Sequence, residues 1–328
     1  MPVRIAGTGV HLPPEIVTNQ RLAETLDTSD EWIVARTGIR ERRRLAPGLA
    51  TSDMCVAAAR PALAATGCTA LDVDAIIVAT YTYDQPLPST ALIVKEALGA
   101  HRALTFDITQ AACANGVQAL FLGSLLLQSG AADRVLVVAA DSASRVTDPE
   151  DRTTRVFFGD AAGAALLTTS TSPGAGLLGW DFGAELSYDV EIPAGGSRLP
   201  AGATTFADKR HYLKMNGRTV WDTATRCLPD SVLNAVGQAG ISVDDVDHFF
   251  LHQANLNIVV AAMDKLGVPR ERAPITVDRL GNTGSAGVFT VLHQSFADGS
   301  VRAGDTFVVS AIGAGFQWGT LCFRHGAS

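Results

Sequence analysis

Hydrophobic residues along this chain gather in short runs that alternate with longer segments of helical periodicity. Six runs of aliphatic and β-branched residues predict strands, at residues 75–80, 104–108, 135–140, 247–251, 274–277 and 306–312. Helices are predicted where polar capping residues precede apolar periodic segments, from Thr51 to Ala65 and from Asn255 to Leu266. This alternation is typical of a layered α/β domain.

The chain also resembles itself. Three strand-like segments recur in the same order at shifts of 171 to 173 residues, namely 72–78 at 245–251, 105–107 at 276–278, and 133–137 at 305–309. A nearly constant offset predicts two copies of one unit of about 170 residues, with chance similarity as the alternative. We therefore expect two halves, residues 1–170 and 171–328, packed as one pseudo-symmetric body.

Composition narrows the class of protein. The chain has 328 residues, of which 47% are hydrophobic and 18% charged, with 31 glycines and only 6% aromatic residues. This predicts a large core packed closely from small aliphatic side chains. No apolar run approaches the roughly 20 residues that span a bilayer, and the N-terminus lacks the apolar stretch of a signal peptide. We expect a protein of the cytoplasm that does not enter a membrane.

Charge and cysteine spacing exclude further classes. The net charge of −7 argues against a nucleic-acid partner. One local exception is the run from Arg36 to Arg44, which holds five arginines and is either a site for phosphate groups or a solvated turn. Five widely spaced cysteines without a CxxC pair disfavour a disulfide scaffold or a zinc ribbon.

Ligands in open α/β sheets bind at the carboxyl ends of strands, so residues that follow a predicted strand are candidates for chemistry. Cys113 follows the run 104–108 and precedes a helix-forming segment. At a helix start, unpaired N–H groups and the helix dipole favour the thiolate, which is a nucleophile. The alternative is a buried structural cysteine.

Two polar residues of the second copy are further candidates. His252 directly follows the run 247–251, and Asn282 lies in a loop that the repeat offset equates with the Cys113 region. Pseudo-symmetry therefore predicts that Cys113, His252 and Asn282 meet at one site, although a core histidine and a turn asparagine are the alternatives. The other histidines show no metal-ligand spacing with His252, so no metal is expected.

Glycines follow the last predicted strand in Gly313-Ala314-Gly315. A dinucleotide-binding motif is excluded because only nine residues follow Gly319, too few for the required helix and strand. Glycines here would instead let backbone N–H groups approach a reacting carbonyl and form an oxyanion hole. No GxSxG motif occurs, which excludes an α/β-hydrolase.

Seven motifs together carry a resemblance to a known family. They are DTSDEWIVARTGIRER (27–42), AAC (111–113), DPEDR (148–152), FGDAAGA (158–164), HQAN (252–255), GNTGSAG (281–287) and GAGFQWG (313–319). With them the chain closely resembles β-ketoacyl-acyl-carrier-protein synthase III, the condensing enzyme that initiates fatty-acid synthesis, and its relatives in polyketide pathways. The resemblance implies a homodimer with a thiolase-like fold, in which two pseudo-symmetric α/β halves form a layered α-β-α-β-α body.

The same resemblance implies a catalytic triad of Cys113, His252 and Asn282, with acyl-CoA as substrate and no other cofactor. Cys113 would accept the acyl group while its own N–H and that of Gly315 hold the oxyanion. A malonyl thioester, carried by acyl carrier protein or by CoA, would then lose CO2. Neutral His252 and the Asn282 amide would stabilise the enolate that attacks acyl-Cys113 to give a 3-oxoacyl thioester.

The resemblance also implies where CoA binds. Trp32 and Arg152 would lie around the adenine, Arg36 near the phosphates, and Gly217 and Asn255 along the pantetheine tunnel. Leu87 aligns with a residue, often Phe, that closes the acyl pocket from the partner subunit, so we expect a longer or branched primer.

This chain departs from the family pattern in places that concern its substrates. It has GNTGSAG where the family usually reads GNTSAAS, and Ala114-Asn115 after the nucleophile where Ala-Gly-Phe is common, which indicates a reshaped acyl pocket. Asn257 and Asp264 replace basic residues used for docking the carrier protein, so an acidic carrier would be attracted less. A dedicated secondary-metabolism carrier, a malonyl-CoA donor and an absence of condensation all remain open.

The absence of condensation defines the rival function. Some relatives transfer the acyl group from cysteine to a hydroxyl or amine acceptor, with the histidine as general base. Retention of Asn282 favours condensation, because an enolate needs a second hydrogen-bond donor. A non-enzymatic acyl-CoA-binding protein would require an inert Cys113.

Overall fold

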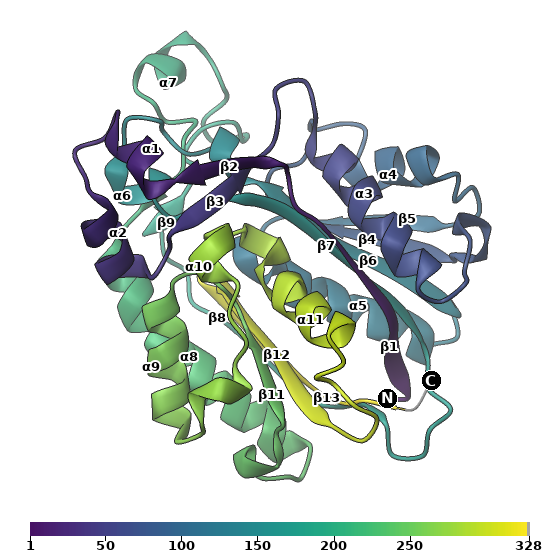
Figure 1. The fold of residues 1–328 in the computed structure, drawn as a ribbon. Helices are drawn as coiled ribbons and strands as arrows, with labels where there is room; N and C mark the ends of the chain where they lie inside the picture. Colours follow the sequence, from purple (N-terminus) through teal and green to yellow (C-terminus); the bar gives the residue numbers. More distant parts are fainter. Residues whose placement is uncertain (327–328) are drawn as a thin grey trace.

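Two mixed β-sheets form the centre of the protein, whose computed structural model describes residues 1–326 (Figure 1). The first sheet has the strand order β1 (Val3–His11), β7 (Asp160–Thr169), β6 (Arg134–Ser142), β4 (Ala75–Ala79) and β5 (Leu104–Ile108). The second has the order β11 (His248–Leu251), β12 (Thr306–Gly313), β13 (Gln317–Arg324) and β8 (Gly176–Ala184). Two small ribbons pair β2 (Glu15–Thr18) with β3 (Glu41–Arg44), and β9 (Val190–Glu191) with β10 (Lys214–Met215).

The two large sheets repeat one topology. β4 and β6 are parallel, as are β11 and β12. β6 is antiparallel to β7 as β12 is to β13, and β1 is antiparallel to β7 as β8 is to β13. The internal repeat of the sequence thus corresponds to a repeated strand pairing.

Five of the six predicted strands are confirmed, and the prediction for residues 274–277 is wrong. There the side chain of Gln253 takes the place of a strand partner, because its Oε1 accepts hydrogen bonds from the N–H groups of Thr276 (3.0 Å) and Val277 (3.2 Å). The chain then turns at once into the short helix α10 (Val277–Leu280). The second sheet therefore has no counterpart of β5.

Helices cover both faces of each sheet. The main ones are α3 (Thr51–Ala64), α4 (Thr90–Leu98), α5 (Asn115–Gln128), α8 (Gly217–Gln238), α9 (Leu256–Leu266) and α11 (Gly287–Ala297). The shorter ones are α1 (Asn19–Ala23), α2 (Asp30–Thr37), α6 (Arg152–Arg155) and α7 (Ala203–Ala207). The helices predicted at 51–65 and 255–266 are confirmed as α3 and α9.

The layers follow the predicted α-β-α-β-α order (Figure 1). α3 and α4 pack on the outer face of the first sheet, α5 and α11 lie between the sheets, and α8 and α9 cover the second sheet. The thiolase-like fold class is therefore confirmed. This order brings the carboxyl ends of strands from both halves toward the central helices, where the candidate residues lie.

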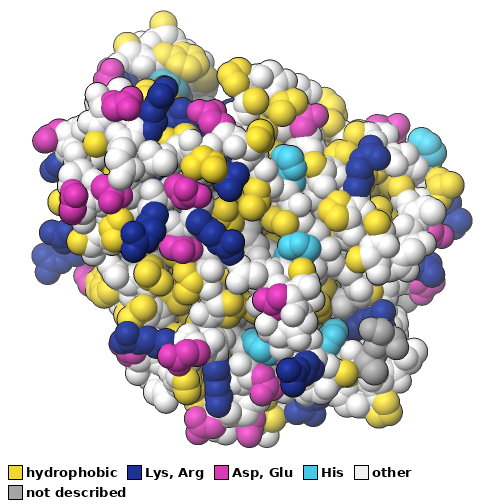
Figure 2. Space-filling model, in the orientation of Figure 1, with side chains coloured by type: hydrophobic (Ala, Val, Ile, Leu, Met, Phe, Trp, Pro, Cys, Tyr) yellow, Lys and Arg dark blue, Asp and Glu magenta, His cyan; other side chains and the backbone are white. Residues whose placement is uncertain are grey.

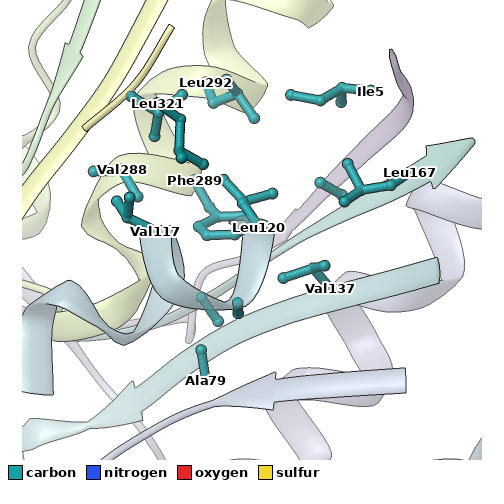
Figure 3. Close-up of a cluster of buried hydrophobic side chains, with 14 of the residues drawn as sticks. Ile5, Ala79, Val117, Leu120, Val137, Leu167, Val288, Phe289, Leu292 and Leu321 are labelled. Carbon is teal, nitrogen blue, oxygen red and sulfur yellow. The ribbon is translucent and has the colours of Figure 1, made fainter. Parts of the chain in front are cut away.

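The core between the sheets explains the glycine-rich, aromatic-poor composition (Figure 3). Buried side chains from both central helices and both sheets meet here, including Val117, Leu120, Val137, Leu167, Val288, Phe289, Leu292 and Leu321. Phe289 fits only because two neighbours lack side chains: a Cβ on Gly163 would lie 2.4 Å from its Cβ, and one on Gly116 would lie 2.9 Å from its ring. Glycine thus allows the central helices to approach each other and the first sheet.

The surface carries both signs of charge. On the face drawn in Figure 2, Lys and Arg side chains are interspersed with Asp and Glu. Within residues 1–326, no helix has the length and apolar character needed to cross a membrane.

Candidate active site

Cys113, His252 and Asn282 lie together on the wall of one mainly apolar cavity. The two halves of the chain both contribute, as the pseudo-symmetry predicted. The rest of the wall comes mainly from α8, α9, the end of β12 and the loop after it, and includes Val220, Ala224, Leu228, Ile258, Ile312 and Phe316. Reactive groups at one apolar cavity are the usual arrangement of a site that binds an organic ligand.

Cys113 lies in a tight 3-10 turn, Ala112–Ala114, between β5 and α5. Ala112 has a φ of +44°, a left-handed conformation that costs energy for a residue with a side chain. Gly313 presses against this turn, because a Cβ there would lie 2.0 Å from the carbonyl oxygen of Ala111 and 2.8 Å from the Cys113 nitrogen. The turn holds the Cys113 Sγ 4.0 Å from the Asn282 Oδ1.

The prediction that Cys113 rests as a thiolate is wrong. Burial, together with the carboxylate of Asp141, raises the pKa of its thiol to about 12, because the N–H of Cys113 and the side chain of Asn282 offset only part of their effect. α5 begins two residues later, at Asn115, so the dipole effect expected of a helix start does not decide the outcome. Cys113 is therefore a thiol at rest, and a role as nucleophile would require it to lose its proton.

His252 is held in place as the continuation of β11. Its N–H donates to the carbonyl of Ser310 on β12 at 2.8 Å, and its side chain is buried. Burial lowers the pKa of the imidazole to about 4, so the ring is neutral at physiological pH. Its Nδ1 has no hydrogen-bond partner among residues 1–326, and lies 3.1 Å from the place a Cβ on Gly287 would occupy.

Asn282 is oriented by its own loop. Its N–H donates to the Phe157 carbonyl at 2.7 Å, and its carbonyl accepts from the N–H of Gly159 at 3.0 Å. The side-chain Oδ1 accepts from the Gly284 N–H at 3.0 Å. With Oδ1 engaged, the NH2 group is the part of this amide that can donate to a ligand.

Asp141, which the sequence analysis missed, links the loop of Asn282 to the turn of Cys113. Its Oδ1 accepts from the Thr80 hydroxyl (2.9 Å) and the Tyr81 N–H (3.0 Å), while its Oδ2 accepts from the Ser285 N–H (2.7 Å). The Ser285 hydroxyl in turn donates to the Ala112 carbonyl at 3.0 Å. Burial raises the pKa of Asp141 to about 6. Asp141 directly follows the predicted strand at residues 135–140, and this position was the sequence signal that could have identified it.

The residues expected to hold the adenine do lie together. The Arg152 guanidinium carbon is 5.4 Å from the centroid of the Trp32 ring. Arg152 is held there by a hydrogen bond from Nη1 to the Asp27 carbonyl at 2.7 Å. A partly exposed aromatic face beside a guanidinium is suited to stacking a planar base.

Asn255 and Arg36, expected at the pantetheine and at the phosphates, are joined by a hydrogen bond. Asn255 caps α9 by accepting from the Asn257 N–H at 2.8 Å, and its amide donates to the Arg36 carbonyl at 3.1 Å. Gly217 begins α8, next to the cavity-lining Met215, and a Cβ there would meet open space. The structure thus joins the end of α2 to the start of α9 and places the start of α8 beside the cavity.

The two remaining candidates lie outside the cavity wall described above. Gly315 stands between Ala314 and Phe316, which line the cavity, and its carbonyl accepts from the Ser187 N–H at 2.6 Å. Its φ of +136° favours glycine. Leu87 is 84% exposed in the loop before α4.

The arginine run does not act as one unit. It spans the end of α2 and strand β3, and Arg42 is only 3% exposed. The Arg42 guanidinium donates to the Asn19 Oδ1 (2.8 Å) and to the Val17 and Val156 carbonyls (3.1 and 2.7 Å). For Arg42, both the phosphate-site and the solvated-turn interpretations are wrong, since it holds three segments together.

Paired sheets of this topology, with a cysteine turn, a histidine and an asparagine at one cavity, define an enzyme of the thiolase fold. Models of 3-oxoacyl-[acyl-carrier-protein (ACP)] synthase III and of its C terminal match residues 106–185 and 236–325. The chain is 43% identical over 327 residues to the beta-ketoacyl-[acyl-carrier-protein] synthase III of Symbiobacterium thermophilum, covering 99% of this chain and 98% of that one. It belongs to the β-ketoacyl-acyl-carrier-protein synthase III family.

Solved structures agree. The 3-oxoacyl-[acyl-carrier-protein] synthase III from Aquifex aeolicus VF5 superposes with a TM-score of 0.90 at 36% identity, over 98% of this chain and 100% of that one. The priming β-ketosynthase from the R1128 polyketide biosynthetic pathway also gives a TM-score of 0.90, at 31% identity over 99% and 97% of the two chains.

Proposed function

We propose that this protein transfers a primer acyl group from acyl-CoA to Cys113 and condenses it with a malonyl thioester to give a 3-oxoacyl thioester and CO2. The observation that carries the proposal is the convergence of Cys113, His252 and Asn282 on one cavity. Such a reaction would initiate fatty-acid or polyketide synthesis in the cytoplasm, where CoA thioesters are made. Membership of the synthase III family supports the same reaction.

In the first half-reaction the Cys113 sulfur attacks the thioester carbonyl of acyl-CoA. Because the thiol has a raised pKa, its proton has to leave as the carbon–sulfur bond forms, and the neutral imidazole of His252 is the available acceptor. The N–H groups of Cys113 and Gly315 are proposed to hold the oxyanion. Its collapse expels the CoA thiolate, which takes up a proton and leaves acyl-Cys113.

In the second half-reaction the malonyl thioester loses CO2, and the electron pair of the broken carbon–carbon bond moves into the thioester as an enolate. The neutral His252 ring and the Asn282 NH2 group donate hydrogen bonds to the enolate oxygen. The low pKa of His252 suits this role, since a neutral imidazole donates without requiring a prior protonation. The enolate carbon attacks acyl-Cys113, the carbon–sulfur bond to Cys113 breaks, and the released thiolate takes up a proton from water.

Asn282 separates condensation from simple acyl transfer. For Asn282→Ala we expect acylation of Cys113 within a few-fold of the wild-type rate, because that step needs the cysteine and histidine. Release of CO2 from a malonyl thioester should fall by about 10²–10³, the usual effect of deleting one oxyanion donor. Intact-protein mass spectrometry measures acylation, and labelled CO2 measures decarboxylation.

Cys113→Ala is the matched control and should carry no acyl group. If Asn282→Ala slowed both steps equally, Asn282 would not be an enolate donor. If the wild type formed acyl-Cys113 but passed it to a hydroxyl or amine acceptor without releasing CO2, the rival function would be correct.

We also propose that two copies associate through the edge of the first sheet. β5 is an edge strand, and its Leu104 and Phe106 side chains are 51% and 36% exposed, an unusual position for large apolar residues. A dimer formed there would cover them and bring Leu87 of each copy toward the other. Light scattering on the wild type and on Leu104→Glu tests this proposal, which predicts a dimer that the charged residue weakens.

The identity of the extender can be tested by comparing malonyl-CoA with malonyl-acyl-carrier-protein. Asp264 forms a two-bond pair with Arg270 (2.7 and 2.6 Å), and Asn257 donates to the Arg36 carbonyl at 3.0 Å. Neither Asn257 nor Asp264 carries a positive charge, and the positive charge of Arg270 is already paired with Asp264. These positions therefore offer little attraction to an acidic carrier protein. We propose malonyl-CoA as the better extender, and a higher kcat/KM with malonyl-acyl-carrier-protein would contradict this choice.

A further inference from the structure

A bulky tyrosine stands directly behind the catalytic loops. Tyr81 follows β4, and its backbone N–H donates to Asp141, the same carboxylate that holds Ser285. Its hydroxyl is buried and has no hydrogen-bond partner among the described residues. Burial raises the pKa of this phenol, and the nearby Asp141 and Cys113 act in the same direction. Tyr81 therefore shares the environment of the nucleophile, although the mechanism above gives it no role.

The Tyr81 ring occupies space that a side chain at position 284 would need. A Cβ added to Gly284 would lie 2.8 Å from the Tyr81 Cε1 and 2.3 Å from the Asp141 Oδ2, both closer than real Cβ contacts. Gly284 stands in the motif GNTGSAG, at a position where the family usually has serine. The glycine at position 284 and the tyrosine at position 81 are thus related, because the missing side chain of Gly284 leaves the space that the Tyr81 ring fills.

The Tyr81 ring also packs behind part of the cavity wall. Tyr81 packs in a cluster that includes Phe158, Val190 and Met215, and these three residues line the cavity that contains Cys113. Other parts of the cavity wall come from α8 and α9, through Val220, Ala224 and Ile258. An acyl group on Cys113 has to share this cavity with the arm of the incoming malonyl thioester, so a bulky ring that supports the wall at Phe158 limits the length of chain that fits.

We propose that Tyr81 is the residue that limits the primer, so that Cys113 accepts short acyl groups such as acetyl and propionyl. This inference rests on the proposed acylation of Cys113. It differs from the expectation of a longer or branched primer, which was based on Leu87. Leu87 is 84% exposed within one chain, whereas Tyr81 is packed against the cavity wall of its own chain.

The test is a competition among primers. Wild type, Tyr81→Ala, Tyr81→Phe and Tyr83→Ala are each exposed to an equimolar mixture of acetyl-, butyryl-, hexanoyl- and octanoyl-CoA, and the mass added at Cys113 is measured. Wild type should carry acetyl at least 10-fold more than hexanoyl. Tyr81→Ala should carry hexanoyl or octanoyl at least as well as acetyl. Tyr81→Phe, which keeps the ring, and Tyr83→Ala, which changes an exposed neighbour, should keep the wild-type preference.

Three results would overturn the inference. They are efficient octanoyl transfer to the wild type, an unchanged preference in folded Tyr81→Ala, and a shift in Tyr81→Phe equal to that in Tyr81→Ala. If Tyr81→Ala does not fold, the smaller opening made by Tyr81→Leu decides in its place, with butyryl and hexanoyl gaining over acetyl. A wild type that takes no acyl group from any CoA would instead refute the proposed function, and the inference would fall with it.

Discussion

Replacing His252 should make the protein less sensitive to acid. Burial lowers the pKa of His252 from 6.5 to about 4, so the folded protein binds this proton more weakly than the unfolded chain does. As the pH falls below 6.5 the unfolded chain takes up the proton while the folded protein resists it. The stability of the wild type therefore decreases between pH 6.5 and about 4, and this histidine has no such effect above that window.

The size of the effect follows from the two pKa values. The gap between 6.5 and about 4 corresponds to about 3.4 kcal/mol when the window has been crossed completely. At pH 5 the unfolded chain is almost fully protonated at this position and the folded protein is not, so about 2 kcal/mol has been lost relative to pH 8. His252→Asn removes this loss while it retains a polar side chain of similar reach.

The assay is urea unfolding of wild type and His252→Asn at pH 8 and pH 5, at one fixed protein concentration because association contributes to stability. His11 and His293, whose pKa values burial also lowers, are present in both proteins, so their effects cancel in the comparison. We expect the wild type to lose about 2 kcal/mol more than the variant between the two pH values. Equal losses would refute a buried, neutral His252.

Two further predictions concern binding and the cysteine turn. Arg152→Ala should raise the KM for acyl-CoA by about 3- to 30-fold with little change in kcat, the size of one cation–π or stacking contact, and should not affect a short pantetheine-type thioester that lacks adenine. Gly313→Ala should abolish acylation of Cys113 and lower Tm, because its Cβ would lie 2.0 Å from the Ala111 carbonyl oxygen. Steady-state kinetics checks the prediction for Arg152→Ala. Intact-protein mass and thermal melting check the prediction for Gly313→Ala, and normal acylation of the folded variant would contradict it.

Local pattern and repetition were sufficient to predict the positions of the three candidate residues. Cys113 and His252 each follow a predicted run that forms a strand, and the repeat offset related the Asn282 loop to the Cys113 turn. These predictions succeeded because strand periodicity is local and because both sheets use one topology. Their catalytic roles are tested by the experiments above.

Properties that depend on remote packing could not be predicted. The pKa of Cys113 is raised by burial and by Asp141, which lies in a different segment of the chain. Residues 274–277 have the hydrophobic pattern of a strand, yet a single side chain, Gln253, takes their backbone hydrogen bonds. Arg42 looked like its charged neighbours in sequence, but three oxygen atoms from other segments enclose its guanidinium.

One measurement tests condensation at Cys113 most directly. Enzyme carrying one acetyl group on Cys113 is freed of acetyl-CoA and mixed with malonyl-CoA or malonyl-acyl-carrier-protein in a single turnover. The mechanism predicts one CO2 and one 3-oxobutyryl thioester for each acetyl group that leaves the cysteine, with neither product from Cys113→Ala. Loss of the acetyl group from Cys113 without CO2 and 3-oxobutyryl thioester, with both donors, would contradict the account.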